Sequence, residues 1–75
     1  MVTANLRFKY IHAGHQMATS ELTGTHYVVR TRPKNDGWMA IDETEGLVIM
    51  TELTLFHAKQ ECERWDEIKH KEDQS

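Results

Sequence analysis

Residues 25–65 most limit what this chain can fold into, because a hairpin pattern is followed directly by a helical one. Residues 25–32 are rich in β-branched and aromatic side chains, which favours a strand. Pro33 ends this strand, since proline cannot donate a ladder hydrogen bond, and residues 34–37 read Lys-Asn-Asp-Gly, a turn composition. The segment therefore predicts a β-hairpin with residues 38–42 as its second strand.

A third strand and a helix are predicted to follow the hairpin. Residues 47–50 form a short, fully apolar run after a second turn, which favours a strand. The next apolar residues recur at intervals of three and four, the spacing of one helical face: Leu55, Ala58, Cys62 and Trp65. Thr51 and Thr54 are alternative caps for this helix, because a threonine hydroxyl can accept a hydrogen bond from a free amide.

The N-terminal third of the chain is less regular. Residues 5–12 partly alternate between apolar and polar side chains, which predicts one more strand. Residues 12–24 are polar and include two glycines, so we expect a long loop of the kind that is often mobile. Because the run Met-Ala-Thr-Ser from Met17 resembles a translation start, residues 1–16 are either part of the folded core or an extension of it.

These elements predict one α+β domain over residues 1–75. A small antiparallel sheet of three to four strands would pack on one C-terminal amphipathic helix, in the order β-β-β-β-α. Residues 1–24 would be the N-terminal strand and loop, residues 25–70 the hairpin-strand-helix core, and residues 71–75 a frayed tail. A core of this size supplies only about 3–5 kcal/mol, so we expect a partner subunit to add stability.

The register of the hairpin decides which side chains lie beside the helix, since a slip of one residue exchanges the two faces. A five-residue loop turns Trp38 away from the helix, onto the face of Arg30 and Arg32. A four-residue loop instead turns Trp38 towards the helix, beside Ala40. We favour the first register, because it gathers both arginines beside the tryptophan.

Composition narrows the location and the partner classes. The single cysteine excludes an internal disulfide, and no apolar run is long enough to span a membrane. Arg7 and Lys9 lie where a secretory signal would be apolar, so we expect a reducing, cytoplasmic location and no membrane partner. Residues 1–40 carry five basic and two acidic residues, whereas residues 41–75 carry four basic and ten acidic residues. Such asymmetry indicates either a charged binding face or the solvated face of an acidic helix, and we favour the second interpretation.

Catalytic and metal-binding patterns are weak in this sequence. His12 and His15 have the H-x-x-H spacing, and His26 and Cys62 are further candidate ligands. Cys62, however, lies on the apolar stripe of the predicted helix, where a buried cysteine behaves as a small hydrophobic residue. No nucleophile lies in a strand–turn–helix setting and no phosphate-binding loop is present, so we expect neither enzyme activity nor a metal or other cofactor.

The strongest functional signal is a residue set typical of protein interfaces. Arginine, tryptophan and tyrosine dominate binding hot spots, and the hairpin carries all three. The predicted partner-binding residues are Arg30, Arg32, Trp38 and Tyr27. We therefore predict a small non-enzymatic module that docks on a larger protein and blocks its site as an inhibitor, or that forms a homodimer.

Nucleic-acid binding is the alternative prediction. A basic sheet face can follow a phosphate backbone, and aromatic side chains can stack on bases. The candidate nucleic-acid-binding residues are Arg7, Lys9, Arg30, Arg32 and Lys34. The acidic residues of the second half of the chain would oppose a polyanion, so we rank this prediction below protein binding.

Residues 26–65 resemble two families of small domains in which a three-stranded meander precedes one helix. The shared features are Trp38 and Ala40 after a glycine turn, a threonine before the helix, and Ala58 and Trp65 along it. The families are the HicB-type antitoxin domains and the N-terminal arm-binding domains of phage integrases. Similarity to the first implies a partner toxin, and similarity to the second implies a basic sheet that reads DNA. Both imply a small bacterial or phage accessory protein.

Overall fold

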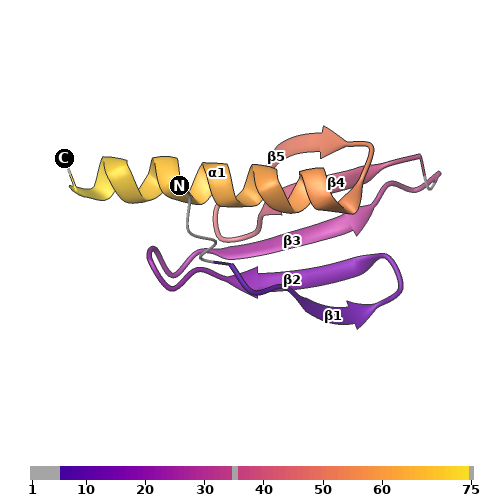
Figure 1. The fold of residues 1–75 in the computed structure, drawn as a ribbon, viewed down its shortest axis with the longest axis horizontal. Coiled ribbons are helices and arrows are strands. Elements are labelled where there is room, and N and C mark those ends of the chain that lie inside the picture. Colours follow the sequence, from indigo (N-terminus) through magenta and orange to yellow (C-terminus); the bar gives the residue numbers. More distant parts are fainter. Residues whose placement is uncertain (1–5, 35, 75) are drawn as a thin grey trace.

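Five antiparallel strands and one helix make up the fold. The structure, a computed structural model, describes residues 6–34 and 36–74. The strands lie in the sheet in chain order, each paired with the next (Figure 1). Their bounds are β1 Lys9–His12, β2 His15–Thr19, β3 His26–Thr31, β4 Trp38–Asp42 and β5 Leu47–Glu52, and the helix is α1 Leu55–Gln74. The predicted α+β class is confirmed, with five strands where three to four were expected.

The additional strand, β2, lies inside residues 12–24, where the sequence predicts a loop. The loop prediction is wrong there, because all five residues of β2 pair with β3. Backbone pairing with a neighbour stabilises a strand whose side chains are of mixed polarity, and local propensity does not reveal this. The predicted C-terminal tail, residues 71–75, is helical as far as Gln74.

The helix α1 covers one face of the sheet, where it packs against β3, β4 and β5 (Figure 1). Thr54 caps its first turn: the hydroxyl accepts a hydrogen bond from the amide of His57, and the carbonyl accepts one from the amide of Ala58, both at 3.1 Å. Thr51, the alternative cap, lies instead in β5, because that strand continues to Glu52.

The core lies between α1 and the sheet. The predicted helical stripe faces it, with Ala58 and Cys62 fully buried. The sheet supplies the other half of the core, namely Ala18, Tyr27, Val29 and Ala40, with Trp38 and Ile49 at the margin. Leu6 is buried in the same core, and the Lys59 ammonium lies 5.4 Å from the centre of the Phe8 ring. Leu6 therefore belongs to the folded core, and β1, which follows it, is an edge strand of the sheet.

The register of the β3–β4 hairpin differs from the favoured one. Val29 lies opposite Ala40, and the amide of Arg32 donates to the carbonyl of Gly37 at 3.0 Å, which leaves a four-residue loop. The favoured register is therefore wrong, and Trp38 faces the helix. The core explains this outcome, because the observed register places the small side chain of Ala40 beneath α1, where helix and sheet pack closely.

A buried carboxylate on α1 ties the helix to the β2–β3 connection. Asp66 is fully buried. Three hydroxyls donate to it: Ser20 Oγ at 2.6 Å, Thr23 Oγ1 at 2.7 Å and Tyr27 Oη at 2.8 Å. Burial, and then the hydrogen bond to Asp66, raise the pKa of Tyr27 well above its usual range. The network holds the helix against β3, since each donor would lose its partner if the helix moved.

Asp42 forms a second buried anchor at the end of β4. Its carboxylate accepts hydrogen bonds from Trp65 Nε1 and Lys69 Nζ, each at 3.0 Å, and from the amide of Glu45 at 3.1 Å. Burial alone would raise the pKa of Asp42, but these donors outweigh it, and the pKa lies below its usual value. Together the two carboxylates fix which face of the sheet α1 covers.

Candidate interaction surfaces

The second face of the sheet is not covered by any element of the described chain. The helix and the core lie on one side, so the side chains that alternate to the other side point away from both. Cross-strand partners on that side form a row across all five strands: Lys9, Met17, Val28, Ile41 and Val48. We call this side of the sheet the open face, and these five residues its central row.

The open face is apolar at its centre. Val28, in the central strand of the sheet, is only 2% exposed. Met17 and Ile41 on either side of it are half-buried, and Val48 at the β5 end is 50% exposed. Met39, in the next row of the same face, is also half-buried. The face therefore carries an apolar band that is buried at Val28, half-buried beside it and exposed towards β5. Exposed apolar surface often marks an interaction site.

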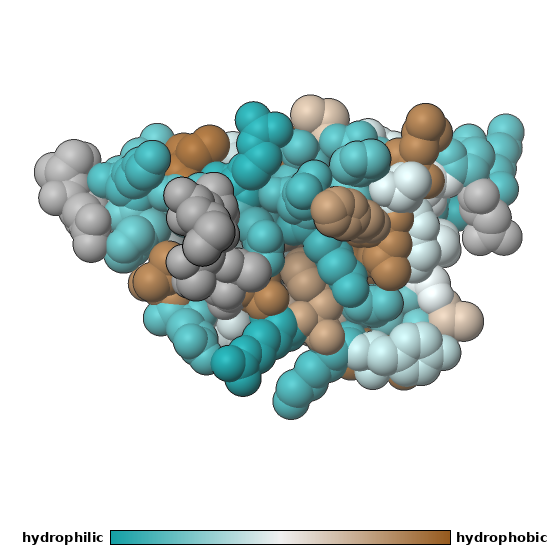
Figure 2. Space-filling model, viewed as in Figure 1, coloured by the Kyte–Doolittle hydropathy of each residue, from teal (hydrophilic) through white to brown (hydrophobic). Residues whose placement is uncertain are grey.

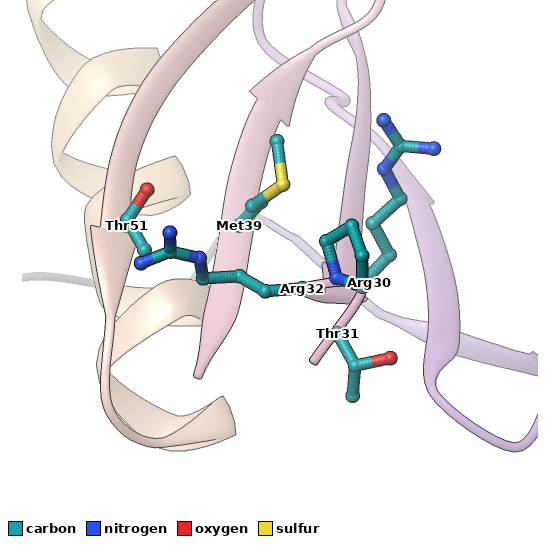
Figure 3. A pocket seen from close by; sticks show the side chains of 6 residues that line it. Arg30, Thr31, Arg32, Met39 and Thr51 are labelled. Carbon is teal, nitrogen blue, oxygen red and sulfur yellow. The ribbon is translucent and has the colours of Figure 1, made fainter. Parts of the chain in front are cut away.

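Two arginines border this apolar band at the end of β3. Arg30 is exposed and lies opposite Met39 of β4. An open hollow of about 540 Å³ is lined in part by Arg30, Arg32, Met39 and Thr51. Figure 3 shows the two guanidinium groups pointing in opposite directions across the sheet, with Met39 between them. Arg32 also pairs with Asp36, at 3.4 Å between Nε and Oδ1, in an exposed ion pair of small energetic weight.

The sheet separates Tyr27 and Trp38 from these arginines. Tyr27 is fully buried beneath α1, where its hydroxyl donates to Asp66. Trp38 is half-buried at the margin of the core. Of the four predicted partner-binding residues, only Arg30 and Arg32 therefore lie together on one accessible face.

The five basic residues predicted for nucleic-acid binding lie on the open face or at its borders. Lys9 belongs to the central row, and Arg30 and Arg32 lie at one end of the face. Arg7 and Lys9 together line a hollow of about 380 Å³, and Lys34 and Arg32 line another of about 220 Å³. Tyr27 and Trp38, the aromatic residues of the hairpin that could stack on bases, lie on the opposite side of the sheet.

The side of the molecule that α1 occupies is mostly hydrophilic (Figure 2). The outward surface of the helix includes Arg64, whose guanidinium pairs with Glu61 at 3.2 Å, and the exposed apolar side chain of Phe56. Charged side chains spread over a helix in this way are typical of a solvated surface. This side therefore offers a suitable control surface for tests of the open face.

The candidate metal ligands of the sequence are spread over the fold. The rings of His12 and His15 lie 4.9 Å apart in the β1–β2 turn, and His26 shares a hydrogen bond of 2.9 Å with Thr19. Among the described residues, no group of three or more His, Cys, Asp or Glu side chains could hold a metal ion. Cys62 is buried, and burial raises the pKa of its thiol to about 12, which disfavours the reactive thiolate at neutral pH.

The apolar band of the open face is not predicted by the sequence. Met17 could not be placed, because its strand was expected to be a loop. The favoured register turns Trp38 away from the helix, so it would place Ile41, three residues further along the same strand, on the helix side. Residues 47–50 did carry a signal, since a strand that is apolar on both sides needs cover from two directions. On one side of β5, α1 packs against the strand. The other side of β5 belongs to the open face.

Comparison of the sequence with protein-family models found no match, and comparisons with curated proteins and with solved structures found none either. The resemblance to HicB-type and arm-binding domains therefore stays a prediction. No stretch of α1, the helix in the described part of the chain, is apolar enough over a sufficient length to span a lipid bilayer.

Proposed function

We propose that this chain is a small non-enzymatic interaction module that binds a larger protein through the open face of its sheet. The observation that supports the proposal is the one-sided cover of the sheet. The helix and the core take one face, while no described element covers the central row, which is apolar in four of its five members and lies beside Arg30 and Arg32. An apolar centre bordered by arginines is typical of protein–protein interfaces.

The partner would present an acidic border around an apolar centre. Lys9, Arg30 and Arg32 put positive charge at the borders of the open face, and charge complementarity steers partners and sets their orientation. The sheet is already formed and is held in place by the two buried carboxylates, so binding would order few additional groups. The module would act by occlusion, with a rigid face covering a functional surface of its partner.

Affinity purification from the native host tests this proposal with two matched double variants. Arg30→Glu with Met39→Glu alters the open face, and Arg64→Glu with Phe56→Glu makes the same chemical change on the exposed side of α1. We expect the partner captured by the wild-type chain to be kept by the helix variant and lost by the open-face variant. Capture by both variants, each shown by circular dichroism to be folded, would contradict the proposal.

Nucleic-acid binding is the second candidate, because Lys9, Arg30 and Arg32 share one face of the sheet. Contacts of such residues with phosphates would make binding fall steeply with salt. Titration of single-stranded and duplex oligonucleotides at two salt concentrations separates the candidates. Salt-sensitive binding that Arg30→Ala and Arg32→Ala abolish would favour nucleic acid, and absence of binding at low salt would dismiss it.

A further inference from the structure

The two edges of the sheet differ in how well they are protected. An edge strand exposes unpaired backbone groups and attracts further strands unless it is short, charged or irregular. The edge strand β1 has all three protections: it has four residues, it carries Lys9, and its pairing with β2 is irregular between Tyr10 and His12. The edge strand β5 has six residues and no charged residue before Glu52.

The strand β5 also exposes large apolar side chains. Leu47, Val48 and Met50 are 40%, 50% and 47% exposed. Leu47 lies opposite Asp42 and Met50 opposite Ala40, which places both on the helix side of the sheet, while Val48 lies on the open face. The free edge is therefore flanked by apolar side chains on both sides of its backbone.

We propose that β5 pairs antiparallel with β5 of a second copy of this chain, so that the two sheets join at this edge. A two-fold axis between Ile49 and Met50 would place Val48 opposite Thr51 of the second copy. Residues 47–51 are uncharged, so two copies can approach along this edge without like-charge repulsion between the strands. The pairing satisfies backbone groups that are otherwise left to water.

The irregularity of β5 makes this register self-consistent. Residues opposite each other in an antiparallel pair must point to the same side of the sheet. The register of the β4–β5 pairing shifts between Ala40 and Ile41, which lie opposite Met50 and Val48. Ile49 therefore has no partner in β4 and is the extra residue of a β-bulge. Because of that extra residue, Val48 and Thr51 both lie on the open face, and Leu47 and Glu52 both lie on the helix side. Each opposed pair of the proposed dimer therefore shares a side.

The helix supplies a second contact beside the joined strands. Lys59 contacts Phe8 on the β1 side of α1. At about 100° per residue, the opposite flank of the helix holds Glu61 and Ile68, and this flank faces the β5 edge. Ile68 is 49% exposed there. The two-fold axis would bring this flank of each helix towards that of the other copy, and the open face would remain free on both copies.

Sedimentation velocity over a dilution series tests the β5 pairing. Met50→Lys places an ammonium at the middle of the edge, on the helix side and away from the open face. Tyr10→Lys, at a side chain that is 69% exposed on β1, is the matched control for the other edge. We expect a wild-type dimer that dissociates on dilution, and a dissociation constant raised roughly tenfold or more by Met50→Lys but unchanged by Tyr10→Lys, since each dimer would bury two ammonium groups.

A wild-type chain that stays monomeric over the whole series would overturn the inference, as would a dimer that Met50→Lys leaves intact or that both variants weaken equally. If Met50→Lys does not fold, amide hydrogen exchange of the wild-type chain at several protein concentrations tests the same pairing. Protection of the β5 amides is expected to rise with protein concentration, while protection of the β1 amides stays constant. Exchange of β5 that does not depend on concentration would overturn it. None of these results depends on the open-face partner, so either proposal can fail alone.

Discussion

Asp66 lies one helical turn after Cys62, on the stripe of α1 that faces the sheet, where an apolar residue would be the usual choice. Three hydroxyls from the β2–β3 connection and from β3 donate to its carboxylate. Every fully buried polar side-chain atom among the described residues has a hydrogen-bond partner, so this network is complete. A complete buried network specifies one packing of helix on sheet, because any shift leaves groups unpaired.

Asp66→Ala is expected to lower the free energy of unfolding by about 2–4 kcal/mol, because the buried hydroxyls of Ser20 and Tyr27 and the half-buried one of Thr23 would lose their acceptor. Gln60→Ala, at an exposed position of the same helix, is the control and should stay within about 0.5 kcal/mol of the wild type. Urea denaturation followed by circular dichroism measures both. Equal effects of the two variants would show that the network adds nothing to stability.

The lowered pKa of Asp42 predicts how stability depends on acid pH. The folded state holds the ionised form of Asp42 more tightly than the unfolded state, whose carboxyl has a pKa of about 3.9. This stabilisation is therefore present above about pH 4 and is lost as the pH falls through the folded-state value. Asp42→Asn should flatten the acid limb of the curve of stability against pH. Lys69→Met should make that limb less steep than in the wild type. A limb that remains as steep in Asp42→Asn would contradict this assignment.

At the scale of elements, the helix was predictable and the sheet only in part. The stripe from Leu55 to Trp65 placed α1 correctly, because helical periodicity is a local signal. The strand β2 was not predictable, since its stability comes from pairing with β3. The turn after β3 was located correctly, but its register depends on how Ala40 packs beneath α1, which is a tertiary property. The apolar band of the open face depends on the presence of β2 and on the register of the β3–β4 hairpin, and so it could not be predicted from the sequence.

Gly37 gives a test of the β3–β4 turn. Its φ is +151°, and a Cβ atom there would lie 2.8 Å from the carbonyl oxygen of Glu52 at the end of β5. Gly24 has a φ of +74° but open space around it. Gly37→Ala is expected to cost about 3 kcal/mol or more, and Gly24→Ala about 1 kcal/mol, because only the first adds a backbone clash to the unfavourable φ. Thermal denaturation of the two variants compares them, and equal losses would argue against close approach of the turn to β5.

At the scale of the whole molecule, the fold leaves two surfaces with different chemistry. The open face combines an apolar band with Lys9, Arg30 and Arg32, and suits a partner with an acidic border. The β5 edge is uncharged over residues 47–51 and suits a second copy. Because the two surfaces share only Val48 and Thr51, a pair of joined sheets could present two open faces side by side, and a dimeric partner would gain avidity from them.

The methyl groups of methionine report on both surfaces in one spectrum. Met17 and Met39 lie on the open face, and Met50 lies at the β5 edge on the helix side. In a chain labelled with ¹³C at its methionine methyl groups, the partner captured from the native host can be added at constant protein concentration. We predict that the signals of Met17 and Met39 shift or broaden while that of Met50 stays in place. A response of Met50 alone, or no response of Met17 and Met39 to a bound partner, would contradict binding through the open face.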